Sequence, residues 1–344
     1  MIAPQERATR AAVLGAGSWG TTFAQVLADA GCDVTVWGRD DAVCAQITEE
    51  HRNETYLPGV LLPETVGATT DARAALDGAE LVAVAVPAQS AGAICAPLAD
   101  ALAPGVVAVS LMKGVELATF RRMSEVLADS LALPADRVVV VSGPNLAHEI
   151  ARRQPTATVV ASIDDDAAAF VVQAVQSPYF RPYTNPDVVG VELCGAVKNV
   201  IAIAVGIAQG RGLGYNTRAT LITRGLVEIT RLGLAMGADA ATFGGLAGMG
   251  DLTATCASPD SRNHAFGVHV GRGLSLADAV EAPGGTTEGV KTSRAVRDLA
   301  RSLGVEMPIT EAVVAVLYEG LPVDDLGPLL LGRPMKAEGV DRPA

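Results

Sequence analysis

The chain has 344 residues, of which 49% are hydrophobic, and its formal net charge at pH 7 is −12. This length and composition predict a globular protein of two domains and exclude a disordered chain. The acidic balance argues against a nucleic-acid partner, because polyanion binding needs a basic surface, but local positive charge can still hold a small phosphorylated substrate.

The cysteines and apolar segments bear on the cellular location of the protein. Five cysteines are scattered without a C-x-x-C pair, which favours reduced thiols over a disulfide framework or a zinc site, and no other spacing predicts a metal. Residues 1–7 lack the apolar core of a signal peptide. The most apolar helical stretch, 200–208, is too short to cross a bilayer. We expect a soluble, cytoplasmic protein with no membrane span.

The first predicted elements form a strand–turn–helix–strand unit. A short apolar strand enters a glycine-rich turn, and a helix over 19–30 and a strand over 34–37 follow. In the turn, Gly15 permits a sharp bend, Gly17 allows a pyrophosphate to approach the backbone, and Gly20 lets the helix pack closely on the strand. The helix N-terminus favours phosphate. The unit predicts dinucleotide binding, and a merely structural glycine turn is the alternative.

The end of the second strand bears on which dinucleotide binds. The first charged residue there is Arg39, whose guanidinium suits a 2′-phosphate. Asp40 and Asp41 follow and could still reach a ribose hydroxyl. We therefore expect NADP to be accepted, with NAD not excluded, although Arg39 could also be a solvated loop residue.

Further apolar runs predict a parallel sheet. Runs at 81–86, 106–110 and 138–141 have the composition of strands buried on both faces, and 156–161 and 178–183 add two more strands. The first three runs end at Pro87, Lys113-Gly114 and Gly143-Pro144, where ligands of open α/β sheets bind. The fold class is therefore α/β, with a Rossmann-like doubly wound N-terminal domain over residues 10–186.

The remainder of the chain predicts helices. Glycines multiply after residue 186 and helical periodicity replaces the apolar runs. We expect an all-α C-terminal substrate domain over 187–331, flanked by flexible tails at 1–9 and 332–344. The glycine- and alanine-rich domain is compatible with a homodimer.

One lysine lies on an apolar helical face. Within a helix predicted over 188–209, the neighbours of Lys198 at helical spacing are all apolar or small. Burial would lower the pKa of this lysine toward the working pH, as a general acid/base requires. The alternative is a lysine that extends its ammonium group into water or pairs with an acid such as Glu192.

Two polar stretches follow in the helical domain. Asp251 ends a glycine-rich loop and could orient Lys198 or accept a hydrogen bond from a substrate hydroxyl, but it could equally be an N-cap. Ser261-Arg262-Asn263 reads as a turn before a helix. There Arg262 offers a fork for a phosphate, unless it simply faces solvent.

The chain closely resembles the bacterial NAD(P)-dependent glycerol-3-phosphate dehydrogenases from about residue 11 to residue 331. The resemblance rests on several separate motifs in the same order. They are Gly15-Ala16-Gly17-Ser18-Trp19-Gly20-Thr21, Lys113-Gly114, Ser142-Gly143-Pro144, Cys194-Gly195-Ala196-Val197-Lys198-Asn199, Gly248-Met249-Gly250-Asp251-Leu252, Ser261-Arg262-Asn263 and Glu288-Gly289.

The resemblance implies interconversion of dihydroxyacetone phosphate and sn-glycerol 3-phosphate by hydride transfer with NADP or NAD, in support of phospholipid synthesis. It assigns Lys198 as the catalytic acid/base. It assigns substrate binding to Lys113, Gly143, Asn145, Asp251, Ser261, Arg262 and Asn263. It assigns cofactor binding to Gly15, Gly17, Ser18, Trp19, Gly20, Arg39, Lys113, Ala147, Arg262, Thr286 and Glu288.

Two departures and two rivals qualify this resemblance. Asn145-Leu146 and Thr286-Thr287 replace residues that are usual in the family. A β-hydroxyacid dehydrogenase would have asparagine four residues after its lysine, where this chain has Ala202. A non-catalytic dinucleotide sensor would share the fold but would not need Lys198 with its polar companions.

Overall fold

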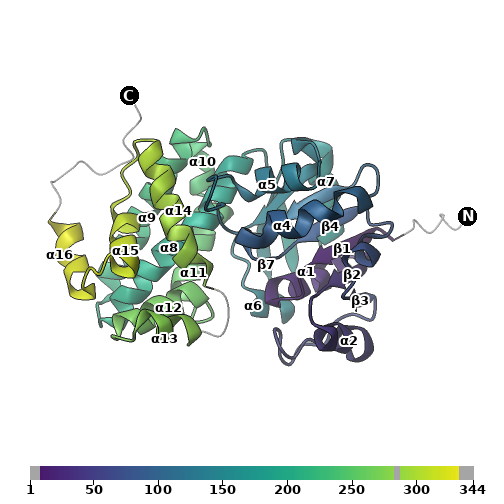
Figure 1. Ribbon diagram of the computed structural model, residues 1–344, viewed down its shortest axis with the longest axis horizontal. Helices are drawn as coiled ribbons and strands as arrows, with labels where there is room; N and C mark the ends of the chain where they lie inside the picture. The colour runs from purple at the N-terminus through teal and green to yellow at the C-terminus, as the bar shows by residue number, and fades with distance from the viewer. Residues whose placement is uncertain (1–7, 283–286, 333–344) are drawn as a thin grey trace, which may run out of the picture. The chain divides into compact units, whose positions relative to one another are not determined.

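A computed structural model describes residues 8–282 and 287–332 of the chain (Figure 1). These residues form two compact units. The first contains residues 8–112, 124–141 and 145–186, and the second contains 113–123, 142–144 and the described residues from 187 onward. The sequence analysis assigned 10–186 to one domain, so the structure differs at the two short segments that carry Lys113 and Gly143. Residues 1–7 and 333–344 of the expected tails lie outside the described residues.

The first unit contains an eight-stranded sheet in the order β3-β2-β1-β4-β5-β6-β7-β8. The strand pairs β1–β2, β2–β3, β1–β4, β4–β5, β5–β6 and β7–β8 are parallel. The strand order changes direction between β1 and β4, which is where doubly wound sheets bind ligands. The strands are β1 (Arg10–Leu14), β2 (Asp33–Trp37), β3 (Val66–Thr69), β4 (Leu81–Val84), β5 (Val107–Ser110), β6 (Val138–Ser142), β7 (Thr156–Ala161) and β8 (Phe180–Asn185).

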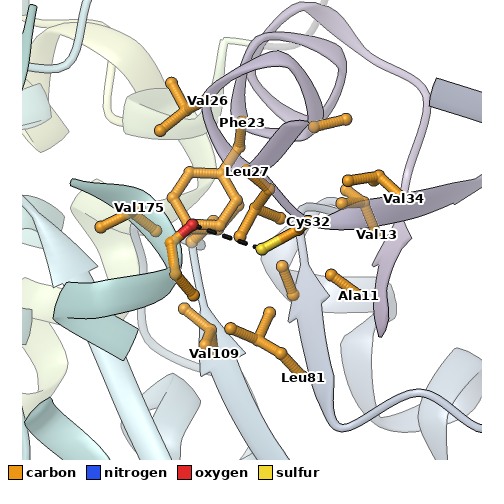
Figure 2. Close-up of a cluster of buried hydrophobic side chains, with 14 of the residues drawn as sticks. Ala11, Val13, Phe23, Val26, Leu27, Cys32, Val34, Leu81, Val109 and Val175 are labelled. Carbon is orange, nitrogen blue, oxygen red and sulfur yellow. Dashed lines mark hydrogen bonds between the residues drawn. The ribbon is translucent and has the colours of Figure 1, made fainter. Parts of the chain in front are cut away.

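The sheet core explains why the strands were recognisable. Every residue of β4, β5 and β6 is buried, as continuous apolar runs predict for central parallel strands. Figure 2 shows Phe23 and Leu27 of helix α1 (Ser18–Asp29) packed with side chains from the sheet in one apolar cluster. In this cluster the thiol of Cys32 donates to the carbonyl oxygen of Ala174 at 3.6 Å. The sequence analysis missed β3, which contains Val66 as its only large apolar residue.

Short helices connect these strands. Asp40, Asp71 and Asp164 accept hydrogen bonds from backbone N–H groups at the starts of α2, α3 and α7, so aspartate N-caps set three of the helix starts. The helices along this part of the chain are α1 (Ser18–Asp29), α2 (Asp41–Glu50), α3 (Ala72–Leu76), η1 (Ala88–Ser90), α4 (Ala91–Cys95), η2 (Ala96–Ala101), α5 (Met123–Ser130), η3 (Ala135–Arg137), α6 (Ala147–Ala151) and α7 (Asp165–Val175).

The second unit is helical, and no strand occurs in residues 187–282 or 287–332. Its central element is α8, which packs against α9, α11, α12, α14 and α15 (Figure 1). The helices are α8 (Val188–Gly210), α9 (Tyr215–Ala235), α10 (Ala240–Phe243), η4 (Leu246–Gly250), α11 (Asp251–Ala257), α12 (Arg262–Gly271), α13 (Leu276–Glu281), α14 (Glu288–Ser302), α15 (Pro308–Tyr318), η5 (Val323–Asp325) and α16 (Leu326–Leu331).

Glycines bring the backbones of α8 and α12 into close contact. A Cβ added at Gly206 would lie 2.2 Å from the carbonyl oxygen of His264, and one at Gly267 would lie 2.2 Å from that of Ile203. Real side-chain atoms do not approach so closely, so the packing of these helices requires glycine at both positions.

The length of α8 corrects one prediction. The sequence analysis considered only residues 200–208 and judged the helix too short to span a membrane. The helix has 23 residues and is long and apolar enough, by length and composition, to cross one. However, nearly all of its residues are buried within the protein. Burial, and not length, therefore identifies α8 as a core helix.

Candidate active site

The glycine-rich turn between β1 and α1 has the geometry that each glycine predicts. Gly15 has a φ of +123°, and a Cβ there would lie 2.6 Å from the carbonyl oxygen of Ala85, directly after β4. A Cβ at Gly20 would lie 1.9 Å from the carbonyl oxygen of Gly15. By contrast, a Cβ at Gly17 would meet nothing within 4 Å. The turn therefore has open space at the position expected to face a pyrophosphate.

Side chains around the turn hold it in place. Asn53 is 1% exposed, and its amide donates to the carbonyl oxygen of Ala16 at 2.9 Å and to the hydroxyl of Thr21 at 2.8 Å. Ser18 donates its hydroxyl to the carbonyl oxygen of Tyr56 at 2.6 Å. The indole N–H of Trp19 is buried without a hydrogen-bond partner within the described structure. Sequence reasoning missed Asn53, which lies more than 30 residues after the turn and belongs to no recognisable motif.

The end of β2 carries an exposed arginine beside a capping aspartate. Arg39 is exposed. Asp40 uses Oδ1 to accept from the backbone N–H groups of Ala42 and Val43 at 2.9 and 3.2 Å. The exposed guanidinium of Arg39 is therefore a group at this strand end that suits an anionic ligand.

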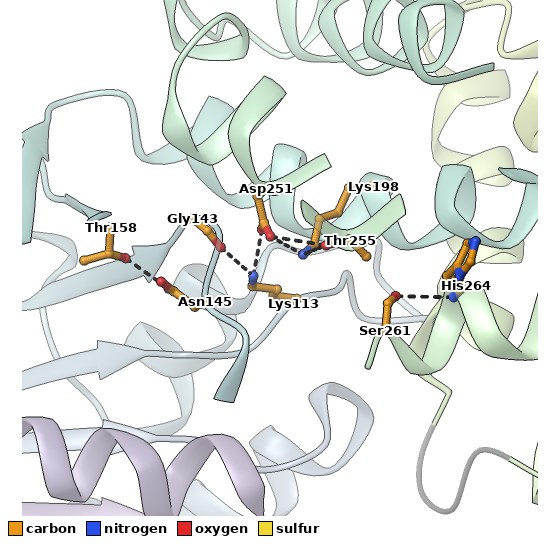
Figure 3. A network of polar contacts seen from close by, with 9 residues as sticks. All are labelled: Lys113, Gly143, Asn145, Thr158, Lys198, Asp251, Thr255, Ser261 and His264. Atoms are coloured by element: carbon orange, nitrogen blue, oxygen red, sulfur yellow. Dashed lines mark hydrogen bonds and ion pairs between the residues drawn. The ribbon is translucent and has the colours of Figure 1, made fainter. Parts of the chain in front are cut away.

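Lys198 lies in the middle of α8, and its side chain is buried among polar partners (Figure 3). The residue is 5% exposed. Its ammonium group forms an ion pair with Oδ1 of Asp251 and donates to the hydroxyl of Thr255 at 2.6 Å. Thr255 in turn lies 3.3 Å from the same Asp251 oxygen. The lysine is therefore buried, as the acid/base interpretation expects, and it is also paired with an acid, which is Asp251 and not the Glu192 that the alternative named.

Burial changes the acidity of this lysine. The pKa of the Lys198 ammonium is lowered from 10.5 to about 7. Loss of hydration is the largest cause, the charge of Asp251 opposes it, and the nearby charge of Lys113 acts in the same direction as burial. The net direction is downward because burial is the largest of these causes. Both protonation states of Lys198 are then accessible near neutral pH, as an acid/base group requires.

Lys113 reaches the same aspartate from another segment of the second unit. Its ammonium group lies 2.7 Å from Oδ2 of Asp251 and 3.2 Å from the carbonyl oxygen of Gly143 (Figure 3). Gly143 has a φ of +143°, which favours glycine. The two oxygens of one buried carboxylate thus hold two lysines, and the cluster carries a net positive charge when both lysines are protonated.

Asp251 is the centre of this cluster. It is 1% exposed and is the first residue of α11, with Gly250 at the N-cap position and no side-chain cap. The N-cap alternative for Asp251 is therefore wrong. Thr255 lies one helical turn further along α11, on the same face. Sequence reasoning missed Thr255, although its i+4 spacing from Asp251 was a usable signal.

The start of α12 contains the three polar residues predicted to bind phosphate. Ser261 caps the helix by accepting from the backbone N–H of His264 at 3.3 Å (Figure 3). Arg262 is exposed. Asn263 accepts from the backbone N–H of Gly289 at 3.0 Å. A Cβ at Gly289 would lie 2.6 Å from that Asn263 oxygen, so the motif around Glu288 packs against α12.

The remaining predicted residues lie in different places. Asn145 belongs to the first unit, where its amide donates to the hydroxyl of Thr158 at 3.0 Å. Ala147 begins α6, and its carbonyl oxygen accepts from Thr22 of α1 at 3.3 Å. Glu288 begins α14. Thr286 lies outside the described residues. Within residues 8–282 and 287–332, no cluster of three or more acidic, histidine or cysteine side chains could hold a metal ion.

Taken together, a glycine turn at the change in strand order and a helical unit with a buried lysine–aspartate pair define a two-domain dinucleotide-dependent dehydrogenase. Residues 10–168 and 187–327 match the N-terminal and C-terminal profiles of NAD-dependent glycerol-3-phosphate dehydrogenase. The chain belongs to this family.

Individual relatives agree. A glycerol-3-phosphate dehydrogenase [NAD(P)+] from Streptomyces griseus is 59% identical over 90% of this chain and 93% of its own length. One from Thermobifida fusca is 54% identical over 96% and 98% of the two chains. The crystal structure of the Coxiella burnetii glycerol-3-phosphate dehydrogenase superposes with a TM-score of 0.90 at 38% identity, covering 95% of this chain and 99% of that one. These similarities support the family resemblance and not the β-hydroxyacid dehydrogenase alternative.

Proposed function

We propose that this protein catalyses the NAD(P)-dependent interconversion of dihydroxyacetone phosphate and sn-glycerol 3-phosphate. The observation that carries the proposal is the buried cluster of Lys198, Asp251, Thr255 and Lys113, in a chain whose relatives are named for this reaction. The proposal includes a cytoplasmic location, a role in supplying phospholipid synthesis, and a homodimer as the working assembly.

Lys198 is the acid/base in this proposal. Its ammonium has three N–H groups, and Asp251 and Thr255 engage two of them, which leaves the third for the C2 oxygen of the substrate. In the reducing direction, Lys198 protonates the oxygen as negative charge develops there. In the oxidising direction, neutral Lys198 takes this proton back. A pKa lowered toward neutrality serves both directions.

Other residues orient and neutralise the substrate. Lys113 stabilises the developing negative charge from its position on the second oxygen of Asp251. Arg262, Ser261 and Asn263 hold the phosphate at the start of α12, where the helix N-terminus favours an anion. Gly143 and Asn145 complete the substrate contacts in this proposal.

The first unit provides a cofactor site that fits a dinucleotide. Gly15, Gly17 and Gly20 shape the turn, and the open space at Gly17 admits the pyrophosphate. Ser18 and Trp19 directly follow Gly17 at the start of α1, and the buried indole N–H of Trp19 has no hydrogen-bond partner among the described residues. The proposed set is completed by Arg39 for a 2′-phosphate, and by Lys113, Ala147, Arg262, Thr286 and Glu288. The bound nicotinamide supplies the hydride.

The decisive experiment is a direct assay. Dihydroxyacetone phosphate is added to purified protein with NADPH or NADH, and the loss of nicotinamide absorbance is followed. We expect turnover with NADPH at least, and none with dihydroxyacetone, which lacks the phosphate. Tight NADPH binding without turnover would contradict the proposal and favour a hydroxyacid substrate or a sensor.

A further inference from the structure

A second buried ion pair lies on α8, outside the proposed catalytic cluster. Arg122 Nη1 lies 2.7 Å from Glu192 Oε2, and the two side chains are 15% and 4% exposed. Glu192 precedes Lys198 by six residues on the same helix. An ion pair in such a place is costly, because both charges lose their hydration, and an apolar pair of similar size would often be as stable. A contribution to stability therefore does not by itself account for the pair.

Arg122 shares a small hairpin with Lys113. Val115 and Arg122 form an antiparallel bridge, and the backbone N–H of Glu116 donates to the carbonyl oxygen of Arg121 at 2.9 Å. Phe120 closes the turn with a φ of +60° and donates to the carbonyl oxygen of Glu116 at 2.9 Å. Lys113 lies two residues before one side of this bridge. The hairpin therefore links the position of the Lys113 backbone to that of Arg122.

The stem of Lys113 lies directly on α8. A Cβ added at Gly195 would be 3.4 Å from Cγ of Lys113 and 3.0 Å from the hydroxyl of Ser142. Gly195 follows Glu192 by three residues and precedes Lys198 by three, so the three positions are neighbours along one side of the helix. The hairpin thus meets α8 at two successive points, Glu192 and Gly195, and Lys113 then reaches Asp251 beside Lys198.

We propose that Arg122 and Glu192 form a positioning pair that anchors the 113–123 hairpin to α8 and thereby fixes Lys113 against Asp251. The inference rests on the proposed function, because it concerns the residues proposed to act in that reaction. Neither Arg122 nor Glu192 needs to touch the substrate. Their effect on catalysis passes through Lys113, and small displacements of such a group are expensive in rate.

The test compares the kcat values of two double variants, each of which neutralises one ion pair of the second unit. The double variant Arg122→Gln/Glu192→Gln removes both charges of the ion pair together. We expect its kcat for dihydroxyacetone phosphate reduction to fall at least about tenfold, while the Kd for NADPH stays within about twofold of the wild-type value. The control is Arg301→Gln/Glu311→Gln, an exposed pair of the same unit with contacts of 2.7 and 2.8 Å. Its kcat should not change.

A second measurement separates positioning from general structural damage. The pair is neutralised again in a Lys113→Ala background, at micromolar enzyme so that slow rates remain measurable. If the pair acts through Lys113, its removal changes kcat by less than about twofold in that background. A further fall of about tenfold, or a wild-type kcat in the Arg122→Gln/Glu192→Gln variant, would overturn the inference. Absence of turnover in the wild-type protein would instead overturn the proposed function.

Discussion

The central strands of the first unit and helix α8 of the second unit both lie in a core, but they bury different kinds of side chain. Strands β4, β5 and β6 contain only aliphatic residues and serine. Helix α8 buries Glu192, Lys198 and Asn199 among its apolar residues. Burial of a charge is tolerated only when a partner compensates for lost hydration, so each charge on α8 requires a specific neighbour. The sheet core builds a scaffold, whereas the core of the helical unit also contains the proposed chemistry.

The same contrast holds for the residues proposed to meet the ligands. In the first unit, the glycine-rich turn offers backbone groups, and the end of β2 offers an exposed Arg39. In the second unit, Lys198 and Asp251 are 5% and 1% exposed. Electrostatic interactions are stronger where water is excluded. Substitutions should therefore cost most at the buried cluster and least at the exposed strand end.

The largest expected effect is at Lys198. Lys198→Ala should lower kcat for dihydroxyacetone phosphate reduction by about a thousandfold or more, because the proton donor is lost. Asp251 keeps Lys113 as a partner, so the fold should persist and NADPH should still bind. Lys291→Ala, which removes an exposed lysine of α14, is the matched control and should keep the wild-type rate. If the kcat of Lys198→Ala equalled that of the wild type, Lys198 would not be the proton donor, and the buried cluster would have no catalytic role to set against the scaffold of the sheet.

The contrast also shows what the sequence could reveal. The strand–turn–helix start was predictable because its three glycines are local and each has a separate steric reason. Lys198 was predictable because a charge on an apolar helical face conflicts with periodicity. In contrast, β3 was missed because Val66-Gly67-Ala68-Thr69 has no apolar pattern to detect.

Partners distant in the sequence were the harder part. Asp251 lies 53 residues from Lys198, and its choice between an N-cap and a lysine partner depends on tertiary packing. Thr255 and Asn53 are common polar residues whose importance comes only from what they touch. The grouping of 113–123 with the helical unit was hidden because chain continuity favours one unbroken domain.

A second prediction tests the packing of α8 itself. Gly206→Ala would place a methyl group 2.2 Å from the carbonyl oxygen of His264, so α8 and α12 must separate. We expect the free energy of unfolding, measured by urea denaturation, to fall by about 3 kcal/mol. Gly327→Ala is the control, because nothing lies within 4 Å of its added Cβ. That variant should be as stable as the wild type or slightly more stable. Equal stabilities of the two variants would show that α8 and α12 are not in close backbone contact.

A third prediction concerns an exposed cation of the same unit. Arg262→Ala should raise the KM for dihydroxyacetone phosphate about tenfold to a hundredfold, as expected for loss of hydrogen bonds to a charged group. Because Arg262 is exposed in the structure, this effect is smaller than that of Lys198→Ala. Arg272→Ala, at the opposite end of α12, should leave KM unchanged. If the two variants gave the same KM, Arg262 would not contact the substrate phosphate.

The smallest effect is expected at the exposed end of β2, in the first unit. Arg39→Ala should lower the ratio of kcat/KM for NADPH to that for NADH by about tenfold, because one charge-assisted contact with the 2′-phosphate is lost. Rates with NADH should stay near wild type, since Asp40 is occupied as the cap of α2 and gains no new role. Arg137→Ala removes another exposed arginine of this unit and should leave the ratio unchanged. A fall in both cofactor rates would mean that Arg39 supports the turn and does not select the dinucleotide. A substitution at the exposed end of β2 would then lower general activity, as a substitution in the buried cluster is expected to do, and the difference between the two regions would be smaller than we predict.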